Sequence, residues 1–352
     1  MSALHTRICD LLGVRYPIVQ TGMGWVSGAR LTAATSAAGG FGILAAATMN
    51  LDELTAAIDK VQSRTEAPFG VNLRADQPDV DKVIALIIDR GIRLASFAGA
   101  PRRELIDQLR FGGVLTMPTI GAPRHAVKMQ KWGVDAVIAQ GGEGGGHTGT
   151  IATSLLLPAV TGSVDIPVLG AGGFSDGRGL VAALAYGAAG IAMGTRFLLT
   201  TESQVPDNVK QVYLQTGLRG TIVTKSIDGY PQRVINTALI QRLEGAGTLS
   251  ALSRSLRHAL SFRRTIGASV GEFLREGLAM RRTQSLSWPQ LAMAANAPMM
   301  TRASMVEGRP EVGILPTGQV TGRIDGLPTV AALLEEIMEE AGQTLARLGG
   351  DR

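Results

Sequence analysis

The chain is poor in cysteine and in long apolar runs. Its single cysteine, Cys9, excludes an internal disulfide and favours a reducing compartment. The apolar runs are interrupted by Gly, Asp or Arg before they reach the roughly 20 residues of a membrane-spanning helix. The first residues lack the basic segment and apolar run of a signal peptide. These absences predict a cytoplasmic protein that does not enter a membrane.

Aromatic residues make up only 4% of the 352 residues, whereas 45% are hydrophobic and 18% are charged. This composition predicts a soluble protein with one large α/β domain and an elaboration, or with two ordinary domains. The net charge of +5 is concentrated between Arg254 and Arg282, where seven arginines face only two glutamates. Such a segment is a solvated helix face, a membrane or RNA surface, or a site for a phosphorylated ligand. Because the remaining chain is balanced in charge, we do not expect nucleic acid as a partner.

Short β-rich runs alternate with helical patterns over the first 200 residues. Strands buried on both faces and separated by helices indicate a parallel sheet, and a count of eight favours closure into a (β/α)₈ TIM barrel. The eight predicted strands are 17–21, 41–46, 69–73, 92–97, 113–119, 135–140, 167–172 and 190–195.

The alternation stops near residue 202. Residues 207–310 have mainly helical and loop patterns, and an amphipathic helix follows over 329–348. We therefore predict a barrel built from 1–201 and 321–352. A smaller, mainly helical cap, or substrate domain, over 202–320 is inserted before the last barrel helix.

Two glycine-rich turns follow the last two predicted strands, in "PVLGAGGFSDGRG" and "GIAMGTRF". Barrels commonly bind a phosphate between these two loops, where backbone N–H groups and helix N-termini converge. The sequence therefore predicts a phosphate site at Gly172, Gly173, Gly194 and Thr195.

Two other motifs compete for the same region. Gly173 to Gly177 also fits G-x-S-x-G, the nucleophile elbow of serine hydrolases, for which His258 is an available base. A dinucleotide fingerprint after the first strand is incomplete, because Ser27 stands where the third glycine belongs. A bound nucleotide would therefore use another mode.

The stretch "AQGGEGGGHTG", residues 139–149, contains six glycines, and such a run permits a close approach to the backbone. His147 follows the sixth strand, at the barrel end where general acid–base groups belong. Glu143 either orients His147 or faces solvent. No further histidine or cysteine clusters with this pair, so we do not expect a metal.

Together these segments resemble the nitronate monooxygenase, or 2-nitropropane dioxygenase, family of FMN-dependent barrels and its relatives, the flavin enoyl-thioester reductases. The resemblance covers nearly the whole chain. It depends on "YPIVQTGM", "LTAATSAAGGFGIL", "FGVNL", "AQGGEGGGHTG", "AGGFSDG", "GTRF" with Glu202, "GYPQRVIN" and "PTGQVTG".

The resemblance implies a role for several residues. The first turn lies along the flavin ring, two amide side chains hydrogen-bond the isoalloxazine or ribityl, and the two phosphate loops hold the FMN phosphate. The glycine-rich stretch passes close to the flavin, and the catalytic His147 faces the substrate. The first turn is Gly22, Met23 and Gly24, and the amide side chains are those of Asn72 and Gln140. The phosphate loops contribute Gly172, Gly173, Gly194 and Thr195, and the glycine-rich stretch contributes Gly145 and Gly146.

The sequence departs from the monooxygenase pattern after the first strand. Those enzymes usually read "QAPM", whereas Gln20 here is followed by "TGMGWVSG", closer to the "GGMAW" turn of the thioester reductases. Trp25 then lies near the flavin edge. An arginine-rich cap suits the phosphates of coenzyme A or NAD(P)H, and the candidate substrate-binding residues there are Arg254, Arg257, Arg263 and Arg264.

We therefore predict an FMN-dependent oxidoreductase that couples NAD(P)H to hydride transfer on a CoA thioester, including intermediates of bacterial sterol-ring degradation. Oxidation of alkyl nitronates by O₂ is the alternative. A serine hydrolase and a phosphate-binding barrel without flavin are more remote. The sequence leaves open the acyl group, the direction of hydride flow, the electron acceptor and whether the chain forms a homo-oligomer.

Overall fold

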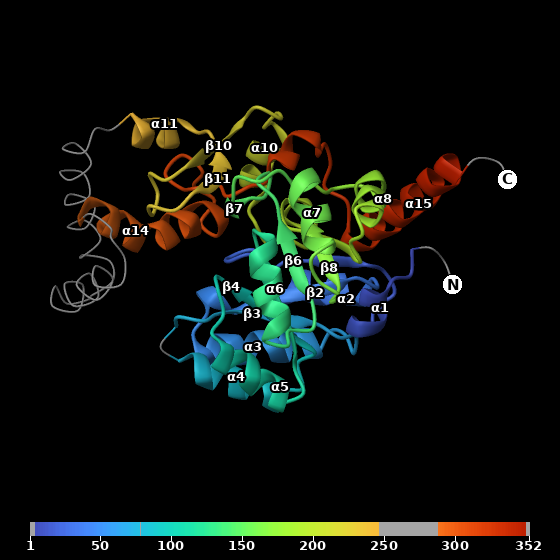
Figure 1. Cartoon of the computed structure of the whole chain (residues 1–352). Coiled ribbons are helices and arrows are strands. Elements are labelled where there is room, and N and C mark those ends of the chain that lie inside the picture. The colour runs from blue at the N-terminus through green and yellow to red at the C-terminus, as the bar shows by residue number, and fades with distance from the viewer. Residues whose placement is uncertain (1–3, 78, 246–287, 350–352) are drawn as a thin grey trace.

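The computed structural model describes residues 4–77, 79–245 and 288–349. Eight parallel strands form a closed barrel, in which β9 returns to pair with β1 (Figure 1). The predicted eight-stranded barrel is confirmed, and each strand falls on one of the predicted runs. The strands are β1 (Ile18–Gln20), β2 (Phe41–Ala45), β3 (Gly70–Arg74), β4 (Leu94–Ala98), β5 (Leu115–Ile120), β6 (Val137–Gln140), β8 (Val168–Ala171) and β9 (Gly190–Met193).

Helices between the strands cover the outside of the barrel. In α3, for example, Asn50 accepts a hydrogen bond from the Glu53 N–H while the Glu53 carboxylate accepts one from the Asn50 N–H, a capping box that fixes the start of the helix. The helices are α2 (Ala29–Ala37), α3 (Leu51–Gln62), α4 (Val80–Asp89), α5 (Arg103–Phe111), α6 (Pro123–Lys131), α7 (Thr153–Thr161), α8 (Gly177–Ala185) and the short α9 (Thr195–Leu198), with a 3₁₀ turn, η1 (Ala46–Thr48), after β2.

A short N-terminal helix, α1 (Arg7–Leu12), closes the end of the barrel where the strands begin. Its Ile8, Cys9 and Leu12 are fully buried among side chains from the barrel strands. Arg93, just before β4, donates to the Leu11 carbonyl at 2.6 Å. This helix was not predicted from the sequence, and it seals the end opposite the predicted site.

The cap lies over the other end of the barrel (Figure 1). Besides helices, its described part contains an antiparallel sheet with the strand order β10-β11-β7, which the sequence analysis did not predict. Its third strand, β7 (Gly146–His147), comes from the glycine-rich stretch of the barrel. The other described elements are α10 (Asp207–Leu214), β10 (Thr221–Thr224), β11 (Gln232–Ile235), α11 (Ala238–Glu244), α14 (Trp288–Met305) and a 3₁₀ helix, η2 (Gln319–Arg323).

The chain then returns to the barrel as α15 (Val330–Gly349), which packs against α8 and α2. Leu334 and Ile337 of α15 are buried in this contact. The approach to α8 is close, because a Cβ on Gly177 would lie 2.4 Å from the Ala341 nitrogen. As predicted, the last barrel helix follows the cap segment.

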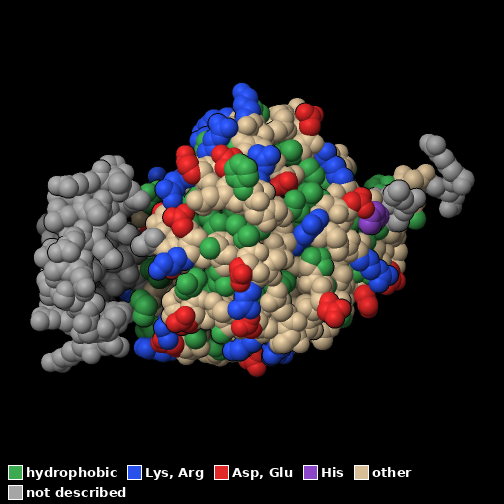
Figure 2. Space-filling view, turned by 90° about the horizontal axis from the view of Figure 1, so that it is seen from below, with side chains coloured by type: hydrophobic (Ala, Val, Ile, Leu, Met, Phe, Trp, Pro, Cys, Tyr) green, Lys and Arg blue, Asp and Glu red, His purple; other side chains and the backbone are tan. Residues whose placement is uncertain are grey.

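On the face shown in Figure 2, basic and acidic side chains are interspersed. The arginine-rich segment 254–282, with Arg254, Arg257, Arg263 and Arg264, lies outside the described residues. No helix in the described part of the chain is both long and apolar enough to span a bilayer.

Candidate functional site

The fold brings the predicted cofactor residues to one end of the barrel. Parallel strands in a barrel all end on the same side, so segments that follow β1, β3, β6, β8 and β9 share one mouth. The first turn follows β1, Asn72 lies in β3, Gln140 ends β6, and the two phosphate loops follow β8 and β9. Residues far apart in the sequence therefore form one candidate site.

The turn after β1 is fixed by a buried serine. The Ser27 hydroxyl accepts hydrogen bonds from Gln20 Nε2 at 2.8 Å and from the Met23 N–H at 2.9 Å. A Cβ on Gly22 would lie 2.3 Å from the Asn72 Cβ, so this glycine lets the turn pack directly on β3. The requirement for glycine at position 22 thus arises from a protein contact, and its proximity to a flavin stays a prediction.

Asn72 is more than nine-tenths buried and its Nδ2 donates to Ser96 Oγ at 2.8 Å. This bond fixes the orientation of the amide. Within the described chain no donor reaches its Oδ1, which is therefore available to an N–H group of a bound ring. The arrangement fits the predicted contact with an isoalloxazine.

The turn after β8 has the features of an anion site. Gly172 and Gly173 adopt φ of +95° and +87°, a backbone conformation that favours glycine. Across the described residues no acceptor is found for either N–H. The nearest atom to a Cβ on Gly173 would be 3.9 Å away, so there is space beside this backbone. In the neighbouring loop, Thr195 Oγ1 accepts a hydrogen bond from the Gly318 N–H at 2.9 Å.

The N-terminus of α8, in contrast, is already occupied by carboxylates. Asp176 accepts from the Gly179 N–H at 2.8 Å and Glu340 accepts from the Gly177 N–H at 2.7 Å. These acidic groups satisfy the positive end of the helix. The expectation that the helix after β8 contributes its dipole to a phosphate is therefore wrong, and the glycine N–H groups remain as the donors there.

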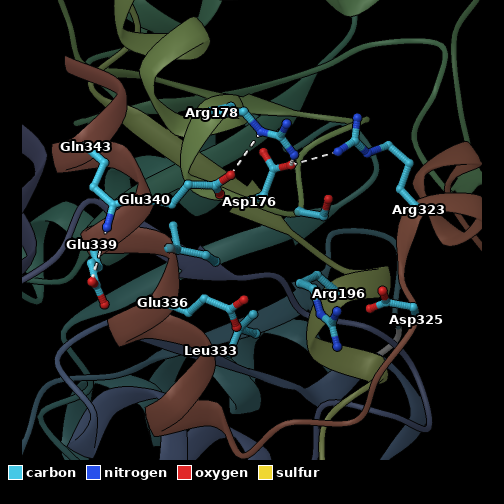
Figure 3. Close-up of a pocket in the computed structure, with 12 residues that line it drawn as sticks. Asp176, Arg178, Arg196, Arg323, Asp325, Leu333, Glu336, Glu339, Glu340 and Gln343 are labelled. Carbon is cyan, nitrogen blue, oxygen red and sulfur yellow. Dashed lines mark hydrogen bonds and ion pairs between the residues drawn. The ribbon is translucent and has the colours of Figure 1, made fainter. Parts of the chain in front are cut away.

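A polar cavity of about 540 Å³ lies beside this turn, between α8, η2 and α15 (Figure 3). Arg178 and Arg323 both contact Asp176, at 3.1 Å and 3.0 Å. Arg178 also forms an ion pair with Glu340, at 2.9 Å. Because three more carboxylates line the cavity, a phosphate is disfavoured there; these are Asp325, Glu336 and Glu339.

Arg196 lies at the inner side of this cavity and has a structural role. It is more than nine-tenths buried and donates to the carbonyls of Leu199 and Gly326, the latter at 2.8 Å. Burial lowers the pKa of Arg196 to about 10. These bonds tie the segment before α15 to the barrel.

The serine-hydrolase alternative finds no described base. Ser175 lines the cavity, but no histidine does. His258, the predicted partner, lies outside the described residues. In addition, β8 is the seventh strand of a closed barrel, whereas a nucleophile elbow belongs to an open sheet.

His147 lies on β7, opposite Gln232 of β11, rather than on a loop. Its Nε2 is 2.7 Å from Asp228 Oδ2 and 3.1 Å from the Gln232 amide nitrogen, which itself donates to Asp228. The Tyr230 ring stands edge-on, with 6.1 Å between ring centroids. The imidazole is 64% exposed and the carboxylate only 14%. The imidazole is thus the exposed member of the pair and the carboxylate the buried one.

The environment of Asp228 favours its charged form. Burial alone opposes ionisation, but hydrogen bonding and the charge of His147, together with bonds from the Tyr230 N–H and Gln232, lower the pKa of this carboxyl. Asp228 is therefore an anion beside the imidazole at neutral pH.

Glu143 neither orients His147 nor simply faces solvent. Its carboxylate accepts from the Thr153 N–H at 2.9 Å and from Thr153 Oγ1 at 2.7 Å. Next to it, the Arg233 guanidinium donates to the Gly142 carbonyl through two nitrogens, at 2.9 Å and 3.2 Å. Both groups therefore fix the path of the glycine-rich stretch, and the orienting role belongs to Asp228.

Two of the six glycines of this stretch are required by close protein contacts. A Cβ on Gly141 would lie 2.0 Å from Thr153 Oγ1, and one on Gly145 would lie 2.4 Å from the Thr317 carbonyl carbon. Gly146 instead has φ of +66° and open space beside it. The chain thus passes closely against its own backbone here, and a close approach to flavin stays a prediction.

Gln140 supports the histidine directly, because its Nε2 donates to the His147 carbonyl at 2.8 Å. The contact of Gln140 with the cofactor stays a prediction. Because Nε2 is used by the His147 carbonyl, Oε1 of Gln140 is the atom left for that contact.

Trp25 adopts φ of +64°, unusual for a bulky residue, in the turn after β1. The Arg302 guanidinium of α14 lies 5.6 Å from the centre of its ring, within the range of a cation–π contact. The cap is therefore in contact with the predicted flavin edge.

The sequence analysis missed Asp228, Gln232 and Arg302 as site residues. Asp228 stands immediately before the quoted motif "GYPQRVIN", which contains Gln232, so the motif itself was the available indication. In the part of the chain that the structure describes, no group of three or more His, Cys, Asp or Glu is arranged to hold a metal ion.

Comparison with known proteins gives the family and the fold of this chain. The family model described as nitronate monooxygenase matches residues 5–340. A protein of Rhodococcus jostii (strain RHA1), the (3aS,4S,5R,7aS)-5-hydroxy-7a-methyl-1-oxo-octahydro-1H-indene-4-carboxyl-CoA dehydrogenase, is 53% identical over 352 residues, which is all of both chains. Among solved structures, FabK from Thermotoga maritima has a TM-score of 0.81 and 33% identity over 98% of each chain. Nitroalkane oxidase from Streptomyces ansochromogenes has a TM-score of 0.75 and 28% identity, over 97% of this chain and 99% of that one.

Proposed function

Since this chain belongs to the nitronate monooxygenase family and is therefore a flavin-dependent oxidoreductase, we propose that it uses FMN to transfer hydride to or from a CoA thioester. NAD(P)H is the proposed redox partner, and the substrate is a ring-carboxyl-CoA intermediate of sterol degradation. We further propose that it works in the cytoplasm.

The observation that carries this proposal is the identity of 53% over the whole chain with a CoA-thioester dehydrogenase. The match includes the cap as well as the barrel. Since substrate choice depends on the residues around the site rather than on the fold, similarity in the cap counts for more than similarity in the barrel.

The described residues fit a flavin mononucleotide. Gly172 and Gly173 offer N–H groups without acceptors, and Asn72 offers a fixed amide. A flavin, when bound, supplies a hydride acceptor and donor at N5. The protein contributes His147, which exchanges the proton that accompanies the hydride.

The remaining residues of the proposal are Trp25, in the turn after β1, and four arginines of the cap segment. Trp25 would contact the substrate near the flavin edge. The arginines 254, 257, 263 and 264 would bind the phosphorylated part of the substrate or of NAD(P)H, because guanidinium groups bind phosphate through two parallel hydrogen bonds. This assignment rests on the sequence, since the arginines lie outside the described residues.

The test is a visible spectrum of the purified protein before and after anaerobic NAD(P)H, followed by a CoA thioester. We expect a yellow protein with a band at about 450 nm, released cofactor that is FMN, and bleaching by one of the two additions. A colourless protein would exclude the flavin chemistry. A yellow protein that responds to neither NAD(P)H nor a thioester would exclude this substrate class.

Nitronate oxidation is the second candidate, because the family model carries that description and a nitroalkane oxidase shares the fold. Oxygen consumption with propionate-3-nitronate would support it. The absence of oxygen consumption in a flavin-loaded preparation would exclude it.

A further inference from the structure

The pairing of His147 with Asp228 goes beyond the assignment of a base. We propose that Asp228 is a positioning residue that fixes the tautomer of His147, with hydrogen on Nε2, so that Nδ1 is the atom offered to the substrate. The identity of the substrate rests on the proposed function, but the tautomer does not.

The direction of the hydrogen bond follows from the chemistry of its partners. An ionised carboxylate only accepts hydrogen bonds, so at 2.7 Å from Asp228 Oδ2 the His147 Nε2 carries the hydrogen. The Gln232 amide nitrogen, 3.1 Å from the same ring nitrogen, then donates to Asp228 and not to the ring. In the neutral ring the other nitrogen, Nδ1, then has a free lone pair. The His147 side chain is 64% exposed, which leaves space for a substrate beside the ring.

Asp228 is itself held in place. Its Oδ1 accepts from the Tyr230 N–H at 3.1 Å, an Asx-type bond that orients the carboxylate within its own turn. Its Oδ2 accepts from Gln232 Nε2 as well as from the histidine. With only 14% of the side chain exposed, the carboxylate has little freedom to turn away.

The backbone of His147 is fixed from two further sides. Pairing of β7 with β11 aligns His147 with Gln232, and Gln140 donates to the His147 carbonyl at 2.8 Å. Within the described part of the chain, the titratable side chains that touch the imidazole are Asp228 and Tyr230. Asp228 is therefore the charged group that determines the orientation and the tautomer of the imidazole.

The consequence for catalysis is a balanced proton transfer. A bound flavin would accept the hydride that the substrate gives up. The C–H or O–H proton that the substrate also loses moves to Nδ1, and the ring becomes an imidazolium. The carboxylate behind Nε2 stabilises that positive charge and prevents the ring from turning. In the reverse direction the same Nδ1–H returns the proton.

The chain offers a matched control. His5 Nε2 lies 2.8 Å from Asp10 Oδ1, a second histidine–aspartate pair, at the closed end of the barrel. Asp228→Asn and Asp10→Asn are therefore the same chemical change in the same kind of pair, one at the candidate site and one away from it.

The experiment measures ¹⁵N shifts of the histidine rings in the flavin-loaded protein without substrate, with His147 assigned by its loss in His147→Gln. We expect the wild type and Asp10→Asn to show His147 protonated on Nε2 and unprotonated on Nδ1. In Asp228→Asn and Asp228→Ala, at a pH where the ring is neutral, we expect the Nδ1-protonated form to appear beside the Nε2-protonated one, because a ring without a directing partner populates both. Asp228→Glu should restore the wild-type pattern in part.

Turnover supplies the second measurement. We expect Asp228→Asn to lower kcat about 10- to 100-fold with a change in KM below about threefold, and Asp10→Asn to leave both unchanged. An unchanged proportion of the two tautomers in both Asp228→Asn and Asp228→Ala would overturn the proposal. So would a changed proportion without loss of kcat. If the wild type turns over no thioester, the proposed function fails, while the tautomer measurement still decides this inference.

Discussion

His147 is the proposed proton-transfer residue, so its removal should separate chemistry from cofactor binding. We expect His147→Ala to keep its flavin, because no predicted flavin contact involves the imidazole, and to lose roughly 10²-fold in kcat, the usual effect of removing a general acid–base group. The measurement is kcat per bound flavin, with flavin content from the visible spectrum. Unchanged turnover would remove His147 from the catalytic residues.

Asp228 should also contribute to stability in a way that depends on pH. Its pKa is lower in the folded protein than in the unfolded chain, so its contribution is complete above the unfolded value and is lost as the pH falls through the folded value. We expect the difference in Tm between the wild type and Asp228→Asn to be larger at pH 7 than below about pH 3. An equal difference at both pH values, measured by calorimetry, would contradict this.

For single residues, the sequence indicates which side chains are candidates for catalysis but not which side chains they hydrogen-bond. His147 was predicted as the catalytic residue from its place after the sixth strand. Its partner was sought at Glu143, four residues away, because sequence proximity was the available guide. The partner instead comes from Asp228, and only the pairing of β7 with β11 brings these residues together. Register between distant strands cannot be obtained from local patterns.

At the scale of elements, the glycine-rich stretch packs against the segment 316–319 that returns from the cap. A Cβ on Gly145 would lie 2.4 Å from the Thr317 carbonyl carbon and 2.5 Å from the Gly318 nitrogen, both backbone atoms. We expect Gly145→Ala to lower the free energy of unfolding by about 1–3 kcal/mol and to reduce flavin content, because the segment must move. Urea denaturation and the ratio of absorbance at about 450 nm to protein absorbance measure the two effects.

Gly149→Ala is the matched control in the same stretch, since nothing lies within 4 Å of its Cβ position. We expect a change within about 0.5 kcal/mol and unaltered flavin content. Equal effects of the two substitutions would show that the stretch, rather than the contact at Gly145, determines stability here.

The barrel elements were predictable and the cap sheet was not. Each barrel strand is an apolar run followed by a helical pattern, so local periodicity carries the information. Strands β7, β10 and β11 are short and partly polar. In addition, β7 belongs to the barrel segment and pairs with β11 of the cap. The glycines of the turn after β8 predict a phosphate loop, but the capping of α8 by Glu340 depends on α15, far along the chain.

For the whole molecule, the two ends of the barrel should differ in their response to mutation. Leu12 is fully buried where α1 seals the closed end. We expect Leu12→Ala to lower the free energy of unfolding by about 2–5 kcal/mol. Turnover per flavin should stay within about twofold, because catalytic groups of barrels lie at the opposite end.

Phe111→Ala is the control, because Phe111 is the last residue of α5 and is 94% exposed. We expect its free energy of unfolding to change by less than about 0.5 kcal/mol. Denaturation curves and kcat on the same preparations test both variants. A loss of turnover in Leu12→Ala that exceeds its loss of folded protein would show that the two ends are coupled.

His147, the proposed base, and the predicted flavin contacts belong to different sheets. Gly172, Gly173 and Asn72 are fixed to the barrel, whereas His147 is the edge of a sheet whose other strands are in the cap. A substitution that shifts β11 should therefore move His147 without displacing Gly172, Gly173 or Asn72. The position of the proposed base and the position of the proposed cofactor can then be altered separately.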